Sequence, residues 1–333
     1  MTYWYPAVRD AVSVLRQRFP KAKILLGGIY ATLCSEHARK TVKPDVLFQG
    51  ESEEHIVEWL ANLKGKVAPL QNLDDLPFPA YDLYPNLKSV ALLTSRGCPN
   101  RCTFCASHQL MPRYRRRSVK NVVEEIEHWH RKFDIHHFAF FDDALLHRAD
   151  SFVKPMLRQV IHHNWPVQFY TPNGLAPRHI DEELAELLYH SGVKNIRLSF
   201  ETVNPERQKR MSSKVTSSDL ETALNYLENA GYNRRDIGVY LLMGLPDQSV
   251  QEVRDSAEFV HQLGASINLA SFSPVPGTDE WRAAIRAGLW HSSTDLLLSN
   301  KSLFPIWSST MGYEPALNEV KQIKALNQKL LKD

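Results

Sequence analysis

The stretch SVALLTSRGCPNRCTFCAS, residues 89–107, joins a short apolar run to three closely spaced cysteines. Cys98, Cys102 and Cys105 have the spacing Cys-x3-Cys-x2-Cys, although the whole chain of 333 residues contains four cysteines. The apolar run before them is typical of a strand buried on both faces, as in a parallel sheet. The cysteines therefore follow a predicted strand, and parallel α/β folds carry their functional sites at this end of the strands.

Similar apolar runs recur along the chain and alternate with helical patterns. The further runs lie at 136–142, 167–171, 195–200, 237–243 and 267–273, and helical spacing of apolar residues is found at 118–133, 181–192, 217–231 and 249–264. This alternation predicts consecutive βα units and a parallel sheet. Six units are fewer than the eight of a closed barrel. The predicted fold is therefore α/β, a partial (βα)6 barrel, with a doubly wound sheet as the alternative.

The ends of these helices carry recognisable signals. Two helices begin with a capping-box pattern, in which a serine is followed three residues later by a glutamate. Three helices end at a glycine, the residue that most readily adopts the left-handed conformation beyond a helix. The serine–glutamate pairs are Ser218–Glu221 and Ser249–Glu252, and the glycines are Gly192, Gly231 and Gly264.

The composition excludes several classes of protein. The net charge of +3 gives no strong attraction to nucleic acid or to a membrane surface. No run of about 18 or more apolar residues occurs, and the N-terminus lacks the pattern of a secretory signal. Four cysteines in so long a chain do not make a disulfide framework, so we expect a protein of the reducing cytoplasm, where clustered cysteines bind metals or perform redox chemistry.

The chain divides into four segments. Residues 1–70 form a separate small α/β segment, and 71–87 form a linker in which the stretch 74–87 holds three prolines. Residues 88–280 are the predicted barrel, and 281–333 have a mixed helical pattern that we expect to pack against it.

The cysteine triplet has the chemistry of a metal centre. Thiolates are soft ligands that suit iron–sulfur clusters and zinc. A closed zinc site requires four ligands, and here His108 is the available fourth. Three thiolates on a [4Fe–4S] cluster leave one iron open for a substrate or cofactor, whereas electron-transfer clusters normally use four cysteines. Cys34, far from the triplet, is interpreted as a small buried hydrophobic residue.

The triplet, with Phe104 before its last cysteine and a six-fold βα array around it, resembles the radical S-adenosylmethionine (radical SAM) superfamily over residues 88–280. The resemblance implies a [4Fe–4S] cluster held by Cys98, Cys102 and Cys105, whose open iron binds the amino and carboxylate groups of S-adenosylmethionine. It further implies a one-electron donor such as flavodoxin or ferredoxin. Reduction would cleave the cofactor to methionine and a 5′-deoxyadenosyl radical that abstracts a substrate hydrogen.

The resemblance also suggests residues that bind S-adenosylmethionine. It implies that Phe104 contacts the adenine, that Asp142 and Asp143 occupy the position of the amino-group binder, and that Glu201 receives the ribose hydroxyls. Asn173, after the third strand, is a further candidate. A capping role for the aspartates, a rim position for the glutamate and a turn role for the asparagine are the structural alternatives. Arg96, Arg101, Arg113, Arg116 and Arg117 are interpreted either as charges that stabilise a bound carboxylate or as a solvated face.

Residues 23–53 carry a second resemblance. ILLGGIYAT and DVLFQGESE resemble the back half of a cobalamin-binding (flavodoxin-like) domain, with Gly27 and Gly28 beneath the nucleotide tail. The Asp-x-His-x-x-Gly loop of that domain would lie before Met1, so we expect a gene fragment or misplaced start, a degenerate remnant, or an assembly with another chain. Cobalamin binding is expected to be absent or weak.

These features predict a radical SAM enzyme acting on a small molecule that the sequence does not identify, with methyl transfer as a possible reaction of a longer form. An inactive cluster-binding remnant and a zinc-binding structural module are the alternatives. A methylthiotransferase acting on tRNA is disfavoured because residues 1–70 contain no second cysteine triad and the chain has no strongly basic tail.

Overall fold

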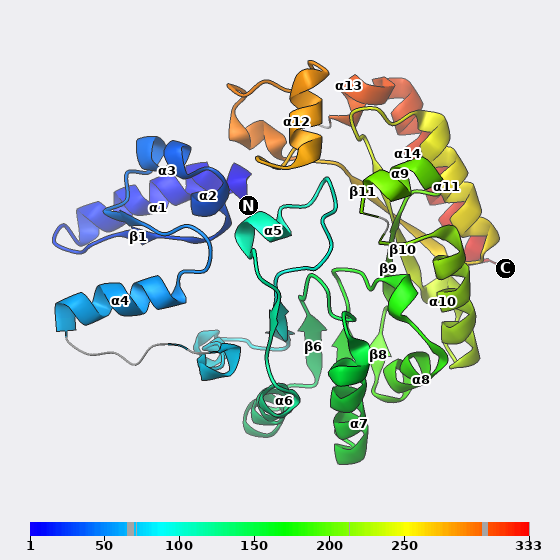
Figure 1. Ribbon diagram of the computed structural model, residues 1–333, viewed down its shortest axis with the longest axis horizontal. Helices are drawn as coiled ribbons and strands as arrows, with labels where there is room; N and C mark the ends of the chain where they lie inside the picture. Colours follow the sequence, from blue (N-terminus) through cyan, green and yellow to red (C-terminus); the bar gives the residue numbers. More distant parts are fainter. Residues whose placement is uncertain (65–69, 71, 213, 302–305, 333) are drawn as a thin grey trace.

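Parallel strands form the wall of an open barrel in the central part of the chain (Figure 1). The computed structural model describes residues 1–64, 70, 72–212, 214–301 and 306–332. One parallel group contains, in spatial order, β3 (Val90–Leu92), β6 (His137–Phe140), β7 (Gln168–Tyr170) and β8 (Val193–Lys194). The other contains β11 (Ser266–Ser271), β10 (Gly238–Met243) and β9 (Arg197–Glu201). A parallel bridge between Leu175 and Leu198 joins the two groups.

The six predicted strands are confirmed as β3, β6, β7, β9, β10 and β11, and β8 is a short addition. Within the described residues no pairing joins β3 to β11, so the wall is open there, as predicted for fewer than eight units. Helices cover the outer side of this wall, which fits the barrel and not the doubly wound alternative (Figure 1). They are α6 (Val119–Phe133), α7 (Val153–His163), α8 (Glu182–His190), α10 (Ser217–Asn229), α11 (Val250–Gln262) and α14 (Tyr313–Leu330).

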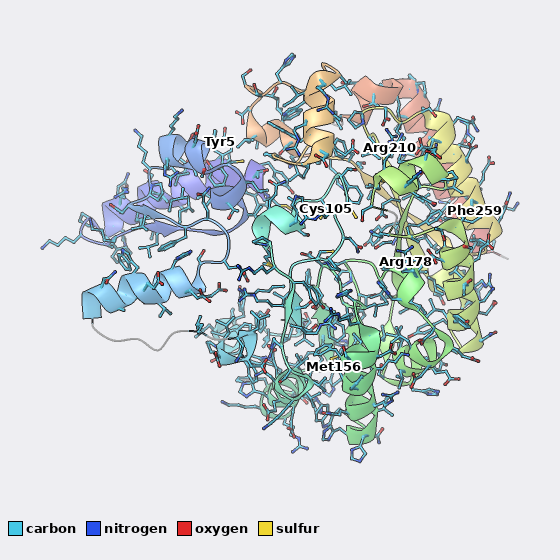
Figure 2. The ribbon with its side chains drawn as sticks, viewed as in Figure 1. Tyr5, Cys105, Met156, Arg178, Arg210 and Phe259 are labelled. Carbon is cyan, nitrogen blue, oxygen red and sulfur yellow. The ribbon has the colours of Figure 1, made fainter. Side chains whose placement is uncertain are left out.

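The barrel core forms between the wall and these helices. Its largest fully buried side chains include Trp129 on α6, Phe138 on β6, Phe169 on β7 and Phe200 on β9. Figure 2 shows Phe259, a side chain of α11 that packs against Phe200 in this layer, on the outer side of the barrel. Along β6, β7 and β10, buried residues alternate with less buried ones, so the expectation of burial on both faces is met fully only on the side toward the helices.

The helix-end predictions are confirmed for the three glycines, which have positive φ values beyond their helices. At α11 the serine half of the predicted capping box is present, because Ser249 accepts from the amide of Glu252, whereas the Glu252 carboxylate is bonded to Thr202 and Arg207. The prediction for α10 is wrong by two residues. The capping residue is Thr216, and it forms a reciprocal capping box with Asp219 rather than Ser218 with Glu221.

The N-terminal segment lies beside the barrel and has a small apolar cluster of its own (Figure 1). It contains α1 (Tyr5–Arg18), β1 (Leu25–Leu26), α2 (Gly28–Leu33), α3 (Ser35–Thr41), β2 (Val46–Leu47) and α4 (Glu53–Lys64). The strands β1 and β2 pair in parallel. Val12, Tyr30, Ala38 and Val42 are buried between these elements.

A two-stranded antiparallel ribbon connects the N-terminal segment to the barrel. Its strands are β4 (Ser95–Arg96) and β5 (Arg115–Arg116), which flank the cysteine loop and α5 (Ser107–Leu110). Arg96 donates to Glu51 at 3.1 Å and to Glu53 at 2.5 Å, and Arg115 is also paired with Glu51. In the basic run at 113–117, Arg115, Arg116 and Arg117 thus make protein contacts, whereas Arg113 is exposed.

The segment after β11 contains α12 (Asp279–Arg286), α13 (Trp307–Met311) and the outer helix α14. Leu245, Phe272, Ala284 and Trp290 form a second buried cluster beneath α12. Among the described residues, no helix is both long enough and apolar enough to cross a bilayer.

Candidate active site

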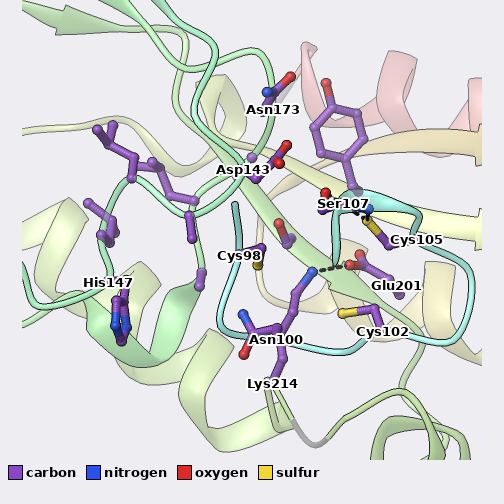
Figure 3. A pocket seen from close by; sticks show the side chains of 18 of the residues that line it. Cys98, Asn100, Cys102, Cys105, Ser107, Asp143, His147, Asn173, Glu201 and Lys214 are labelled. Atoms are coloured by element: carbon purple, nitrogen blue, oxygen red, sulfur yellow. Dashed lines mark hydrogen bonds and ion pairs between the residues drawn. The ribbon is translucent and has the colours of Figure 1, made fainter. Parts of the chain in front are cut away.

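The three clustered cysteines border one cavity of about 330 Å³ inside the barrel (Figure 3). Other parts of its lining come from the C-terminal portions of the strands and the loops that follow them. Ser199 and Glu201 on β9, and Tyr240 and Leu242 on β10, line it with the two-residue period of inward-facing strand positions. The cavity thus lies at the end of the barrel where the sequence placed a functional site.

The cysteine loop depends on a glycine at its start. Gly97 has φ +81°, and a Cβ atom there would lie 2.7 Å from the carbonyl oxygen of Arg113, so no other residue fits without a backbone shift. The amide of Cys105 donates to the carbonyl oxygen of Cys102 at 3.0 Å, which closes the loop. Sγ of Cys105 lies 3.1 Å from Oγ of Ser107.

The thiols fit the ligand set of an iron–sulfur cluster. Burial raises the pKa of Cys102 to about 11, while the positive charge of Lys214 acts in the opposite direction. Binding a cationic cluster offsets this penalty because it stabilises the thiolate form. Among the described residues, no group of three or more His, Cys, Asp or Glu side chains converges on the position of a single metal ion. The fourth cysteine, Cys34, packs against the apolar cluster of the N-terminal segment, and burial raises its pKa to about 11.

A buried ion pair faces the cysteines. Nζ of Lys214 lies 2.5 Å from Oε1 of Glu201, and the two side chains are 15% and 11% exposed. Figure 3 shows the amino group of Lys214 among the three thiols. Burial by itself would lower the pKa of Lys214, but Glu201 and the nearby thiols raise it to about 12, so this lysine is positively charged.

Glu201 has an unusual backbone. Its φ is +72°, and the amide of Thr202 donates to the carbonyl oxygen of Phe200 at 3.0 Å, as in the rare γ-turn with positive φ. Pairing with β10 also skips Phe200, because Tyr240 is opposite Ser199 and Leu241 is opposite Glu201. Such strained residues cost about 1–3 kcal/mol and a bulge of this kind re-aims a side chain.

Of the eight residues predicted from the sequence, seven line the cavity. They are Cys98, Cys102, Cys105, Phe104, Asp143, Asn173 and Glu201. The side chain of Asn173 donates to the carbonyl oxygen of Phe141 at 2.8 Å, so it also joins the loops after β6 and β7.

Asp142 is the exception, and its predicted cofactor contact is corrected. Its side chain is 3% exposed and does not line the cavity. The carboxylate accepts hydrogen bonds from the hydroxyls of Thr94 at 2.8 Å and Ser95 at 2.5 Å, and from the amide of Thr94 at 3.1 Å. Asp142 therefore ties the end of β6 to the segment that leads into the cysteine loop, a role that differs from both the cofactor contact and the capping of the following turn.

Sequence reasoning missed several lining residues. Lys214 lies in the run MSSKV, which has no motif, and Tyr240 is hidden within an apolar strand. His147 and His179 line the cavity with ring centroids 6.5 Å apart, and burial together with neighbouring cations lowers the pKa of both. Two histidines 32 positions apart in different loops give no local signal.

Arg116 supports the wall that carries His147. Its guanidinium donates to the carbonyl oxygens of His147 at 2.8 Å, Leu145 at 2.9 Å and Ala144 at 3.3 Å. It also lies 4.5 Å from the ring centroid of Phe152. Burial lowers the pKa of Arg116, but neighbouring Tyr114 and Asp142 oppose this effect. Because the Arg116 guanidinium is bonded to these carbonyl oxygens, the geometry does not favour the expected role of stabilising a bound carboxylate.

An open parallel β/α barrel with three thiols at the carboxyl ends of its strands defines an enzyme that holds an iron–sulfur cluster. The sequence profile of the Radical SAM superfamily matches residues 92–260, and the chain belongs to this superfamily. The cofactors of this superfamily are a [4Fe–4S] cluster and S-adenosylmethionine.

Two curated relatives are methyltransferases by name. An uncharacterised methyltransferase of Pyrococcus horikoshii is 28% identical over 262 residues, which are 74% of this chain and 55% of the relative. Cytidylyl-2-hydroxyethylphosphonate methyltransferase of Streptomyces wedmorensis is 25% identical over 334 residues, with coverage of 81% of this chain and 62% of the relative. The chain thus spans little more than half the length of these relatives.

Solved structures show the same fold. The radical SAM methyltransferase TsrM of Kitasatospora setae, with cobalamin and a [4Fe–4S] cluster bound, is 17% identical and has a TM-score of 0.69. The match covers 84% of this chain and 61% of TsrM. OxsB, a cobalamin-dependent radical enzyme with aqua-cobalamin and S-adenosylmethionine bound, is 14% identical with a TM-score of 0.64, over 98% of this chain and 52% of OxsB.

Proposed function

We propose that this chain starts a radical reaction on a small molecule, with a [4Fe–4S] cluster on Cys98, Cys102 and Cys105 and S-adenosylmethionine beside it. The observation that supports this most directly is that the three thiols and the Glu201–Lys214 pair border one cavity. When bound and reduced, these cofactors supply a 5′-deoxyadenosyl radical that abstracts a hydrogen atom from the substrate.

The lining residues suggest how the chain binds the cofactors. In this proposal Glu201 accepts hydrogen bonds from the ribose hydroxyls and Asp143 accepts them from the amino group, and the position of both residues in the cavity lining supports it. Lys214 supplies positive charge beside the thiolates and restrains the Glu201 carboxylate. Phe104 lies between the cavity and the second apolar cluster, so its ring can pack against the adenine.

Methyl transfer is the second candidate, and the names of the two curated relatives favour it. We propose that the chain consists of the segments 1–70, 71–87, 88–280 and 281–333, and that residues 1–70 correspond to part of a cobalamin-binding domain. We further propose that this chain alone binds cobalamin weakly or not at all. The two short strands β1 and β2 leave little sheet on which the nucleotide tail could lie. Titration of the protein with aquacobalamin tests the proposed weak binding. Absorbance and filtration measure how much cobalamin stays with the protein.

The remaining partners follow from the chemistry. A one-electron donor such as flavodoxin or ferredoxin would reduce the cluster, and the reducing cytoplasm would keep the thiols available. The substrate is proposed to be a small molecule because the cavity inside the barrel has a volume of about 330 Å³. Neither a nucleic acid nor a membrane is expected as a partner.

Anaerobic reconstitution with iron and sulfide tests the proposed function. We expect cluster absorbance, about four iron atoms per chain, and 5′-deoxyadenosine from S-adenosylmethionine after reduction with dithionite. Zinc in place of iron would contradict the proposal and support the structural-module alternative. A cluster that forms without cleavage of S-adenosylmethionine would instead support the inactive remnant.

A further inference from the structure

The backbone at Glu201 is anchored immediately after its γ-turn. Thr202 is 1% exposed, and its hydroxyl donates to Oε1 of Glu252 on α11 at 2.8 Å. Its carbonyl oxygen accepts from Nε2 of Gln208 at 2.8 Å, and Gln208 belongs to α9 (Pro205–Arg210). The amide of Val203 donates to Oγ of Ser256 at 3.0 Å. Three hydrogen bonds, two of Thr202 and one of Val203, therefore fix the backbone directly after Glu201.

The anchor is itself rigid. Arg207, 4% exposed, binds both carboxylate oxygens of Glu252, with distances of 2.6 Å from Nε to Oε1 and 2.9 Å from Nη2 to Oε2. It also donates to Asp247 at 2.7 Å. A bidentate arginine–carboxylate pair has a fixed planar geometry, so the Glu252 oxygen that receives the Thr202 hydroxyl is held in place.

These contacts explain how the strained turn persists. In a regular strand without the bulge, Glu201 would lie opposite Leu242 instead of Leu241. The side chains that follow would then point to the other face of the sheet. The strain at Glu201 favours that relaxation, and bonds to Thr202 oppose it. The surrounding structure must over-determine a positive φ at a residue that is not glycine.

We propose that Thr202, Gln208 and Glu252 are positioning residues, a clamp that holds the Glu201 carboxylate toward Lys214 and the cavity. The clamp acts through Glu201, because none of its three residues lines the cavity that the cysteines border. The inference rests on the proposed function in one respect, since the carboxylate thus positioned is the one assigned to the ribose of S-adenosylmethionine.

Substitutions at Thr202 and Gln208 test the clamp. Thr202→Val removes the hydroxyl at nearly constant volume, and Gln208→Leu removes the bond to the Thr202 carbonyl. We expect each to raise the Kd of S-adenosylmethionine on the reconstituted protein by about tenfold or more. Thr202→Ser keeps a hydroxyl and is expected to restore binding to within about threefold of wild type. The reduced cluster should keep its own electron paramagnetic resonance spectrum in every variant, while the change on adding S-adenosylmethionine should weaken in Thr202→Val.

Asn327→Leu is the matched control. Asn327 also clamps backbone by two hydrogen bonds, to the amide and carbonyl of Ile267, each 2.8 Å long, at the opposite end of β11. We expect it to cost stability without changing the Kd of S-adenosylmethionine. If Asn327→Leu weakens binding as much as Gln208→Leu does, the effect is one of general stability and the clamp is rejected.

A crystal structure of the unreconstituted Thr202→Val or Gln208→Leu protein gives a readout that needs no cofactor. We expect Glu201 to lose its positive φ and Nζ of Lys214 to lose contact with Oε1. A retained γ-turn and ion pair would overturn the inference, even if wild type forms no cluster and the proposed function fails. Conversely, a wild-type protein that binds S-adenosylmethionine, with unchanged binding in both variants, would reject the clamp and leave the proposed function intact. Should Thr202→Val fail to fold, Gln208→Leu and Thr202→Ser give the same decision.

Discussion

The two sides of the cavity are built in different ways. On one side, Cys98, Cys102 and Cys105 lie within eight residues of a single loop between β4 and β5. On the other side, Glu201 ends β9 on a strained turn, and Lys214 reaches it from beyond α9. The first side needs a local spacing of ligands, and the second needs the whole barrel wall to be correctly paired. The difference shows which part of a site a short motif can specify.

The largest expected effect comes from the local side. Cys102→Ala should abolish the cluster, because two thiolates do not hold a [4Fe–4S] cube with one open iron. Iron and sulfide content after anaerobic reconstitution, together with cluster absorbance, measures the loss. We expect near-zero iron in this variant.

Cys34→Ala is the matched control, since Cys34 is also partly buried and packs in the N-terminal segment. It should retain the iron content of wild type. Loss of iron in Cys34→Ala and not in Cys102→Ala would show that the loop is not the cluster site, and would remove the basis of the comparison.

The sequence predicts the cysteine side well because its information is local. The apolar run and the three cysteines lie within residues 89–107, so the strand and the ligands follow in order. The barrel itself was predictable for a similar reason, since each strand and helix carries its own periodicity. The capping box of α10 was displaced by two residues because Thr216, Ser217 and Ser218 are all suitable caps, and Asp219 provides the reciprocal partner of Thr216.

The next effect tests the second side of the cavity. Lys214→Met should destabilise the protein by about 3–5 kcal/mol, since it leaves the buried carboxylate of Glu201 without a partner. Denaturant unfolding of the apo-protein measures this change. The double variant Lys214→Met/Glu201→Gln should recover part of the loss, because no unpaired charge remains.

The same variants separate stability from binding. Neither Lys214→Met nor the double variant should bind S-adenosylmethionine with the affinity of wild type, even where stability is recovered. If the double variant is no more stable than Lys214→Met, the ion pair is not the reason for the loss, and the second side is not organised around it.

Sequence reasoning found Glu201 through a family resemblance and missed Lys214, for physical reasons. The positive φ of Glu201 depends on hydrogen bonds between its neighbours and residues on α9 and α11. Lys214 follows α9 without a motif around it, and its partner is 13 positions away. Long-range pairing of this kind leaves no periodic or local trace in one sequence.

Two adjacent aspartates give a smaller and sharper test. Asp142→Ala should cost about 1–3 kcal/mol, because three buried hydrogen-bond donors of Thr94 and Ser95 lose their acceptor. Asp143→Ala removes an exposed side chain that lines the cavity, so stability should change by at most about 0.5 kcal/mol. Thermal or denaturant unfolding of the two apo-proteins measures the contrast.

Binding should reverse the order of the two variants. Asp143→Ala should weaken S-adenosylmethionine binding several-fold, and Asp142→Ala should affect it less once the protein is folded. The opposite pattern would restore Asp142 as a direct cofactor contact, and would show that the segment 94–107 does not depend on it for its position.

The smallest expected effect concerns the ribbon that joins the cysteine loop to the N-terminal segment. Glu53 is paired with Arg96 at 2.5 Å, but its side chain is 37% exposed and Glu51 remains as a second partner of Arg96. Glu53→Gln should therefore cost about 0.2–1 kcal/mol at low salt, and less at about 1 M salt because screening weakens exposed pairs. Glu54→Gln, at the exposed neighbouring position, is the control and should change nothing measurable.

The contribution of the Glu53–Arg96 pair to stability depends on pH in a predictable direction. Burial raises the pKa of Glu53, but hydrogen bonds from Arg96 and backbone amides outweigh it and hold the pKa below its ordinary value of 4.5. The pair therefore stabilises the fold fully above pH 4.5 and loses its effect as the pH falls through the folded-state pKa. Glu53→Gln should remove this part of the acid limb in unfolding measured from pH 7 downward, while iron content at pH 7 stays at the wild-type level. If Glu53→Gln lowers iron content as well, the cysteine loop depends on a distant segment and its local character is disproved.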